Sequence, residues 1–285
     1  MRIMLTGANG QVGWELAQRT AKHEIFALDR AALDITQPAA VQQAVTDSAA
    51  DLVINAAAYT GVDRAEQEPD LAFAANRDGP AHLATACAQL NIPLFHISTD
   101  YVFDGKQQAP YREDDPVAPL GIYGRSKWEG EEAVRHTLPA HIILRVSWVF
   151  GRHGHNFVKT MLRLAREREQ LRVVADQHGC PTYAGSIADV LLTLADRFDA
   201  DGSLPWGTYH YCDTPATTWH GFTEAIVAMA SDCEPLCVRE VLPITTREYP
   251  TPAARPANSV LNCSRIRDHL AIAPGLWQTG LSAIR

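Results

Sequence analysis

Short, nearly continuous apolar runs alternate with longer amphipathic segments along the first half of the chain. Apolar runs without polar alternation are typical of strands that are buried on both faces, as in a parallel sheet. The segments between them repeat apolar residues at helical spacing, which predicts helices packed on the sheet. The predicted strands are residues 3–6, 24–29, 52–55, 93–97 and 141–146. The predicted helices are residues 11–20, 38–47 and 71–90, and a later helix that carries Tyr123 and Lys127.

This alternation predicts the fold class. Strands that alternate with helices form a doubly wound parallel sheet with helices on both faces, an α/β Rossmann-like architecture. After Gly151 the pattern loosens: helices are predicted at 156–169 and 186–198 and a strand at 208–212, and proline then becomes frequent. We expect a smaller mixed α/β lobe there, with some segments returning to the sheet.

The expected division of the chain has two parts. Residues 1–150, with returning segments at about 184–213, would form the sheet domain. Residues from about 151–183 and 214–285 would form the smaller, substrate-binding lobe.

Composition and charge exclude several classes of protein. The 285-residue chain is 46% hydrophobic and 20% charged, as in ordinary globular proteins. Its net charge of -8 argues against nucleic acid or an anionic membrane as a partner. No apolar run approaches the roughly 18 to 20 residues of a membrane span, and the first residues lack a signal-peptide pattern. We therefore expect a cytoplasmic protein.

The cysteines and histidines give no pattern of a metal site. The six cysteines are scattered without a Cys-x-x-Cys pair, which favours structural thiols in a reducing compartment. His153 and His155 flank a glycine but lack a third ligand at suitable spacing, so we interpret them as part of a surface loop. The prediction for metal ligands is none.

A glycine-rich turn follows the first predicted strand. Gly7, Gly10 and Gly13 lie between that strand and a helix, where glycines allow the backbone to approach a pyrophosphate closely. Asp29 ends the next predicted strand, near the spacing of about 20 residues typical of a ribose-binding acid. The sheet domain is therefore predicted to bind a dinucleotide. Asp29 favours NADH, whereas the neighbouring Arg30 could neutralise the 2′-phosphate of NADPH, so both cofactors stay open.

Tyr123 and Lys127 are four residues apart and so share one face of a helix. A nearby ammonium favours the phenolate, so we expect Lys127 to lower the Tyr123 pKa from about 10. The polar segment at residues 98–105 precedes this pair and begins at the carboxyl end of the fourth predicted strand, where ligands of such sheets bind. A hydroxyl there, Ser98 or Thr99, could hold a substrate oxygen. With a dinucleotide, the pair predicts hydride transfer coupled to proton transfer at a carbonyl or alcohol carbon.

These motifs resemble the extended, sugar-nucleotide branch of the short-chain dehydrogenase/reductase superfamily. Within that branch, the chain is similar over nearly its whole length to reductases of dTDP-4-keto-6-deoxyhexoses. The stretches that carry the resemblance are residues 10–16, 55–63, 98–103, 123–127, 147–149, 156–165 and 249–256, with Asn258 and Ser259.

The resemblance implies a mechanism. NADPH or NADH would give hydride to C4 of a dTDP-4-keto-6-deoxyhexose, and the product would be dTDP-L-rhamnose. Tyr123 would protonate the forming alkoxide, Lys127 would bind the nicotinamide ribose, and Thr99 would hydrogen-bond the C4 oxygen. The other expected cofactor contacts are Gly7, Gly10, Gln11, Val12, Gly13, Asp29, Arg30, Asp34, Ile35, Ala56, Ala57, Ala58 and Tyr59.

The resemblance also implies substrate contacts. Asp100 matches a substrate-binding residue, and Trp148 matches a tryptophan that faces the sugar, with core packing as the alternative for Trp148. An arginine fork suits a diphosphate, and Arg255 is the leading candidate with Arg163 second.

One position departs from the pattern of the family. Some members are dimers joined through magnesium held by glutamates, of which one corresponds to Glu15 and another to Gly185. Glycine has no side-chain oxygen, so Mg²⁺ is doubtful here. We expect catalysis without a metal, in a monomer or weak homodimer.

Two alternative functions stay open from the sequence. One is an epimerase or dehydratase of the same branch that cycles a retained NAD⁺. The other is a non-catalytic regulatory subunit, which would have no chemical need for Thr99, Tyr123 and Lys127. Facial selectivity at C4 and the exact sugar product are not determined by the sequence.

Overall fold

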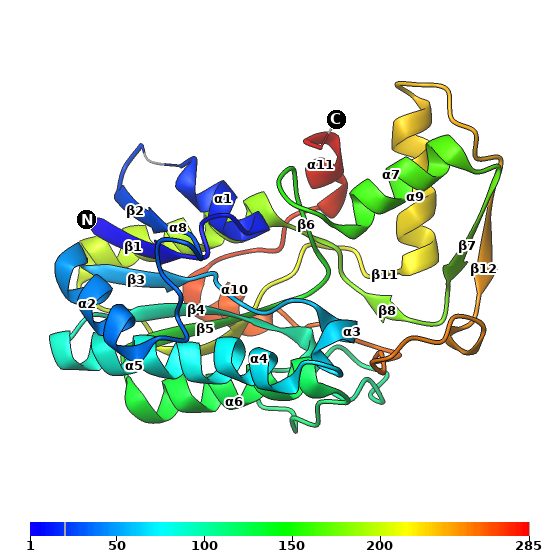
Figure 1. The fold of residues 1–285 in the computed structure, drawn as a ribbon. Helices are drawn as coiled ribbons and strands as arrows, with labels where there is room; N and C mark the ends of the chain where they lie inside the picture. The colour runs from blue at the N-terminus through cyan, green and yellow to red at the C-terminus, as the bar shows by residue number, and fades with distance from the viewer. Residues whose placement is uncertain (20, 285) are drawn as a thin grey trace.

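A parallel sheet forms the centre of the larger part of the molecule (Figure 1). The computed structural model describes residues 1–19 and 21–284. Within these residues, six strands pair in parallel in the order β10-β5-β4-β3-β1-β2. The strands are β1 (Arg2–Thr6), β2 (Glu24–Leu28), β3 (Leu52–Asn55), β4 (Leu94–Thr99), β5 (His141–Val146) and β10 (Gly207–His210). The predicted doubly wound α/β fold is confirmed.

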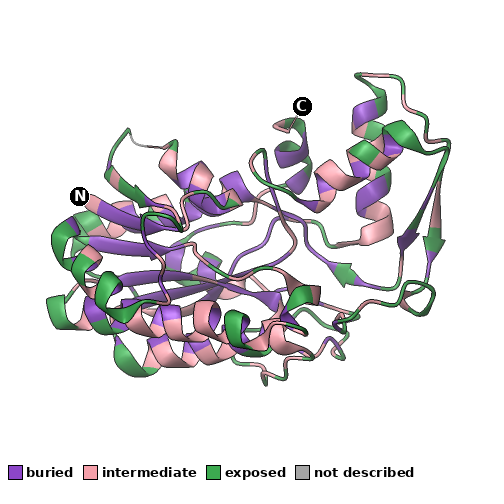
Figure 2. Ribbon diagram, in the orientation of Figure 1, coloured by how far each residue is buried: buried purple, intermediate pink, exposed green. Residues whose placement is uncertain are grey.

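Helices cover both faces of this sheet because successive strand residues point to opposite sides. Ile3 and Leu5 of β1 pack in one core cluster and Met4 packs in the other. The first cluster includes residues of α1 (Gln11–Ala17), α8 (Ala184–Asp201) and α10 (Ser264–Leu270). The second includes residues of α2 (Pro38–Ser48), α5 (Gly79–Leu90) and α6 (Ile122–Thr137). Figure 2 shows the central strands buried and the outer helix surfaces exposed, whereas the edge strand β2 is largely exposed.

The predicted helix at 71–90 is interrupted by a wider turn. The chain passes from α4 (Pro69–Phe73) through a π-helical segment, Ala74–Asp78, into α5. Pro80 has no N–H to donate to the carbonyl of Asn76, four residues earlier, so regular α-helical bonding is lost at this point. The bulge faces Gly130 of α6, where an added Cβ would lie 2.0 Å from the Asn76 carbonyl oxygen. The glycine thus lets α6 pack tightly against the bulge.

The second half contains three short strand pairs and their helices. They are β7 (Gln170–Val174) with β12 (Glu240–Ile244), β8 (His178–Gly179) with β11 (Thr217–Thr218), and β6 (Val149–Phe150) with β9 (Thr182–Tyr183). A separate apolar cluster lies among α7 (Phe157–Glu167), α9 (Trp219–Ser231) and α11 (Trp277–Ser282). The short helix α3 (Val62–Ala65) and the 3₁₀ segments Asp100–Val102 and Thr246–Glu248 complete the elements.

The predicted boundaries differ from the structure by a few residues. The first helix ends at Ala17, and the last residue of its predicted range, Thr20, lies outside the described residues. The segments at 184–201 and 207–210 do return to the sheet. The division into two domains stays a prediction. Because Ile266, Leu270 and Ile272 pack in the first sheet cluster, we propose that α10 also belongs to the sheet domain.

No helix among the described residues is both long and apolar enough to cross a bilayer.

Candidate active site

The glycine turn closes tightly against the end of β3. Gly7 has φ +75°, and a Cβ added there would lie 2.5 Å from the backbone nitrogen of Ala57. A Cβ at Gly13 would lie 2.1 Å from the Gly7 carbonyl oxygen. Any larger residue would open the turn. Because β2 and β3 lie on opposite sides of β1, the turn is at the point where the strand order reverses, which is where open α/β sheets bind nucleotides.

Asp29 lies beside this turn with its carboxylate already bonded. One oxygen accepts from the backbone N–H groups of Ala31 and Ala32 at 2.9 Å each. The other accepts from the Asn9 side chain at 2.8 Å. The Arg30 side chain is exposed and has no hydrogen-bond or ion-pair partner among the described residues. Asp29 is therefore held in a fixed orientation beside the glycine turn.

The remaining predicted cofactor residues divide into two groups. The backbone N–H groups of Ala56 and Ala57 donate to the Thr6 carbonyl and to Asn55 Oδ1, and the backbone of Tyr59 is fixed by two bonds to Asn76. Side chains are occupied elsewhere: those of Val12 and Ile35 are buried in the core. The remaining side chains are bonded within the protein: Gln11 to Val149 and Asn156, Asp34 to the Thr36 N–H, and the Tyr59 hydroxyl to Glu68.

Tyr123 and Lys127 lie one turn apart in α6, as predicted, but their electrostatics differ from the prediction. Lys127 is 2% exposed, and its Nζ donates to the Ile97 carbonyl of β4 at 2.7 Å. Burial lowers the pKa of Lys127 to about 8, with the Glu131 charge opposing the decrease. Burial raises the pKa of Tyr123 to about 12, and the Thr99 side chain only partly counters this. The expectation that Lys127 lowers the Tyr123 pKa is therefore wrong for this structure, because desolvation of the phenolate dominates.

The structure distinguishes the two hydroxyls that the sequence left open. Ser98 is buried, and its hydroxyl donates to the Glu131 carboxylate of α6 at 2.5 Å. Thr99 donates to Asp100 at 3.0 Å and is close enough to Tyr123 to influence its pKa. Thr99, not Ser98, therefore shares a surface with the tyrosine.

Asp100 presents a feature that the sequence did not reveal. The residue is 2% exposed, and its Oδ2 has no partner within hydrogen-bond geometry among the described residues, although the nearby Ser259 and Thr99 side chains favour the ionised form. Burial raises the pKa of this carboxyl to about 7. A buried acceptor without a donor is costly unless a ligand supplies one. A sugar hydroxyl would suit this position.

Two stacked aromatic residues lie after β5, in the second half of the chain. Trp148 has a left-handed backbone, φ 44°, which is rare for a bulky residue and often marks a functional region. Its ring stacks on Trp219 with centroids 3.5 Å apart and an interplanar angle of 6°. Gly179 leaves no room beside it, since an added Cβ would lie 2.3 Å from the Trp148 ring. Sequence reasoning missed Trp219, which no motif singled out.

Arg255 is held at the site by an ion pair. Its guanidinium donates to Asp63 at 2.8 Å and to the Ala253 carbonyl at 2.9 Å. The ring of Tyr101 meets that of Tyr123 edge to face, with centroids 5.6 Å apart. Burial raises the pKa of Tyr101, and the charge of Arg255 opposes this increase. Arg163, the second candidate, lies on α7 with its side chain 59% exposed and pairs with Glu167. The structure therefore places Arg255 near Tyr101, whose ring contacts Tyr123, and leaves Arg163 on an outer helix.

The surroundings of Glu15 and Gly185 do not fit a metal in this chain. Glu15 is 4% exposed, and its two oxygens accept from Arg19 at 2.6 Å and from the Tyr183 hydroxyl at 3.1 Å. A Cβ at Gly185 would lie 2.2 Å from the Tyr183 ring. Within residues 1–19 and 21–284, no three His, Cys, Asp or Glu side chains cluster as metal ligands.

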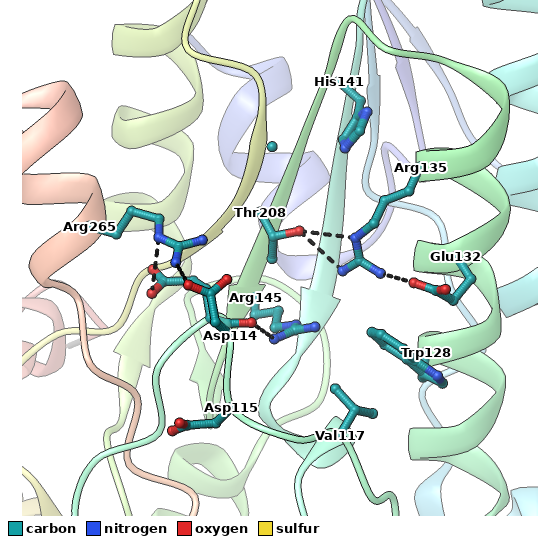
Figure 3. Close-up of a pocket in the computed structure, with 12 residues that line it drawn as sticks. Asp114, Asp115, Val117, Trp128, Glu132, Arg135, His141, Arg145, Thr208 and Arg265 are labelled. Carbon is teal, nitrogen blue, oxygen red and sulfur yellow. Dashed lines mark hydrogen bonds and ion pairs between the residues drawn. The ribbon is translucent and has the colours of Figure 1, made fainter.

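A cavity of about 610 Å³ lies elsewhere, along the β10 edge of the sheet (Figure 3). It contains none of the predicted site residues. Its arginines are paired with neighbouring acids: Arg135 with Glu132, Arg145 with Glu131 and Arg265 with Asp114. Because the cavity is lined by none of the residues of the glycine turn, Thr99 or Tyr123, we do not place the reaction there.

The comparisons with known proteins agree with this geometry. A model of the RmlD substrate binding domain matches residues 1–284. The chain is 44% identical over 292 residues to dTDP-4-dehydrorhamnose reductase of Aggregatibacter actinomycetemcomitans, with 100% of this chain and 98% of that protein covered. A dTDP-4-dehydrorhamnose reductase from Clostridium acetobutylicum superposes with a TM-score of 0.92 at 37% identity, over 99% of this chain and 97% of the other. The enzyme of that name from Bacillus anthracis, in complex with NADP, gives a TM-score of 0.92 at 38% identity, over 99% and 98%.

Proposed function

The chain belongs to the RmlD substrate binding domain family, and from this membership we propose that it reduces the C4 ketone of dTDP-4-dehydro-L-rhamnose to dTDP-L-rhamnose. It is an oxidoreductase that uses NADPH or NADH. The observation that carries the proposal is the grouping of Thr99, Asp100 and Tyr123 at the carboxyl end of β4, on the same edge of the parallel sheet as the glycine turn after β1.

The glycine turn fits a dinucleotide. Gly7 and Gly13 leave space that any Cβ would fill, and such a backbone surface accommodates a pyrophosphate. Asp29 would receive the ribose hydroxyls, with Arg30 available for a 2′-phosphate. When bound, the reduced nicotinamide supplies the hydride to C4.

Tyr123 would supply the proton. A pKa of about 12 keeps the phenol protonated at neutral pH, so Tyr123 holds the proton that the forming alkoxide needs. Hydride at C4 and this proton at the oxygen together convert the ketone to the alcohol. Thr99 would hydrogen-bond the same oxygen as negative charge develops on it. Lys127 would hold the nicotinamide ribose hydroxyls.

The substrate would bind across the side chains that surround this centre. The unpartnered Asp100 oxygen would accept from a sugar hydroxyl, and Trp148 would form an apolar wall for the hexose. Arg255 would bind the diphosphate and would share its guanidinium between the ligand and Asp63. Local recognition of this kind is compatible with an acidic protein, whose net charge is -8.

We also propose that the enzyme works in the cytoplasm, as a monomer or weak homodimer, without a metal. The proposed independence from metal is supported by the bonds that already occupy both oxygens of Glu15.

The test is the oxidation of NADPH and of NADH in the presence of dTDP-4-dehydro-L-rhamnose, with NMR identification of the product. Stoichiometric oxidation of either cofactor, with dTDP-L-rhamnose formed, supports the proposal. Sugar conversion without net cofactor oxidation would instead indicate an epimerase or dehydratase with a retained NAD⁺. The absence of any turnover would indicate a regulatory subunit.

A further inference from the structure

A buried chain of polar side chains crosses the sheet at the carboxyl ends of its central strands. Register places Thr6 of β1 opposite Asn55 of β3, and Asn55 opposite His96 of β4. The Thr6 hydroxyl donates to Asn55 Oδ1 at 2.7 Å, and Asn55 Nδ2 lies 3.0 Å from His96 Nδ1. His96 Nε2 in turn lies 3.5 Å from Lys127 Nζ. All four residues are buried, so each contact is made away from water.

The orientation of the Asn55 amide is fixed by a backbone group. The N–H of Ala57 donates to Asn55 Oδ1 at 3.0 Å, and a backbone N–H is only ever a donor. The oxygen must therefore face Ala57 and Thr6, and the NH₂ group must face His96. An amide NH₂ only donates, so His96 Nδ1 must accept.

The proton of the imidazole is thereby placed on Nε2. A neutral ring carries one N–H, and Nδ1 is occupied as the acceptor of the Asn55 bond. The ring is neutral because burial lowers the His96 pKa well below its usual value, as do the charges of Lys127, Arg135 and His141. The Nε2–H group therefore points at Lys127 Nζ.

We propose that His96 is a positioning residue for Lys127, and that its ring presents an N–H group, not a lone pair, to the lysine nitrogen. A neutral amine can accept from this N–H, whereas an ammonium can only oppose it. The other close partner of Nζ is the Ile97 carbonyl, which accepts from either form. The polar chain from Thr6 through Asn55 and His96 to Lys127, which we call the relay, thus favours release of a proton from Lys127. Its catalytic meaning rests on the proposed function, in which Lys127 acts with Tyr123.

The other groups around Lys127 act in known directions. Glu131, on the same helix, favours the ammonium, but Arg145 of β5 and Arg135 of α6 bond its carboxylate. Tyr123 on α6 is protonated, and Asp100 in the 3₁₀ segment acts on Tyr123. From the neighbouring β4, only the His96 ring faces Nζ with a titratable group, within the described residues.

The relay also joins Lys127 to the cofactor side of the site. Ala57, which fixes the Asn55 amide, is the residue that packs against Gly7 of the glycine turn. A shift of this backbone would reorient Asn55 and therefore change the group that His96 presents to the lysine.

The first test needs no variant. Long-range ¹H–¹⁵N correlation spectra of the ¹⁵N-histidine-labelled protein, without added cofactor, report which ring nitrogen carries the proton. We expect His96 as the neutral Nε2–H form across neutral pH, assigned by loss of its signals in His96→Asn. An Nδ1–H form or an imidazolium would overturn the proposal.

The second test measures the lysine directly. The chain has only four lysines, Lys22, Lys106, Lys127 and Lys159, so ¹³C-lysine spectra are simple to assign. Lys127 should titrate near pH 8 in the unaltered protein. In His96→Asn, the amide oxygen can still accept from Asn55, but the shorter side chain no longer carries an N–H at the position of Nε2, so the Lys127 pKa should rise by about one unit. The control His136→Asn changes an exposed histidine of α6, the helix that carries Lys127, and should leave the Lys127 pKa unchanged. A fall or no change in His96→Asn would overturn the proposal.

Activity separates this inference from the function. If the lysine titration moves in His96→Asn, the pH profile of kcat/KM for the 4-keto sugar should move in the same direction. A lysine titration that moves while the rate profile does not would support the relay and contradict the assigned role of Lys127 in catalysis.

Discussion

At the scale of single residues, the Arg255 guanidinium is already paired with Asp63, so a ligand would share it with this carboxylate. Its pairing with Asp63 holds the guanidinium in place and lowers the Asp63 pKa against the effect of burial. Such preorganisation reduces the side-chain entropy that is lost on binding.

Arg255→Ala should therefore weaken dTDP binding by about 10-fold to 100-fold, as expected for loss of a charge-assisted bond worth about 1.5 to 3 kcal/mol. Calorimetric titration with dTDP measures the change. Arg163→Ala, on an exposed helix, is the matched control and should have no effect. An unchanged dissociation constant in Arg255→Ala would remove Arg255 from the substrate site.

Asp29 permits a second test at this scale. Asp29→Asn keeps an oxygen for the turn that Ala31 and Ala32 close, but it removes the charge that repels a 2′-phosphate. The ratio of kcat/KM for NADPH to that for NADH should rise by about 10-fold, since a bond to a charged acceptor is replaced by a weaker one. An equal change for both cofactors would remove the ribose assignment.

Residue chemistry explains what the sequence could and could not predict here. The positions of Gly7, Tyr123 and Lys127 follow from short-range patterns, and the structure places them on the predicted elements. The Tyr123 pKa depends on burial by distant segments, which no local spacing contains. The unpartnered oxygen of Asp100 and the stacking of Trp219 on Trp148 likewise arise only when separate segments meet.

At the scale of elements, α6 is fixed to the sheet by one buried carboxylate. Glu131 is fully buried and accepts from Ser98 of β4, Arg145 of β5 and Arg135 of its own helix. Burial alone would raise the Glu131 pKa, but the charges and hydrogen bonds of the arginines and of Ser98 lower it below the usual 4.5.

Glu131→Gln should destabilise the protein by about 3 to 5 kcal/mol at pH 7, because it leaves Arg145 buried without its counter-charge. A depressed carboxyl pKa stabilises the fold above the unfolded pKa, so this loss should disappear as pH falls below about 4.5. Urea unfolding at several pH values measures it. Glu132→Gln, at a partly exposed pair on the same helix, should cost less than about 1 kcal/mol. Equal losses in the two variants would contradict this role of Glu131.

The element boundaries illustrate the same limit of sequence reasoning. Apolar periodicity predicted β3 and β5 to the residue, because both are fully buried strands. It did not predict the π-helical segment at 74–78, where Pro80 and the close approach of α6 at Gly130 decide the geometry.

At the scale of the whole molecule, segments that are distant in sequence join the sheet. α8, β10 and α10 all pack on strands from the first half of the chain. Alternation along the first 150 residues predicted the sheet, whereas the return of α10 had no local signal. The assembly around Glu15 of α1 also belongs to this scale, because Arg19, which follows α1, and Tyr183 of β9 both donate to it.

Chelation tests the proposed independence from metal. Turnover should be unchanged after exhaustive EDTA treatment, because the Glu15 oxygens are bonded within the protein and Gly185 offers no ligand. Steady-state NADPH oxidation before and after treatment measures this. Activity that is lost with EDTA and restored by Mg²⁺ would contradict the expectation.

The central claim is that Tyr123 delivers the proton to the C4 oxygen as the hydride arrives. The most direct test is single-turnover reduction of dTDP-4-dehydro-L-rhamnose by Tyr123→Phe, with NADPH affinity measured separately and Tyr209→Phe as a buried control of the same chemistry. Our account predicts a rate about 10² to 10⁴ lower in Tyr123→Phe, with cofactor binding kept and Tyr209→Phe close to the unaltered enzyme. An undiminished rate in Tyr123→Phe would contradict it.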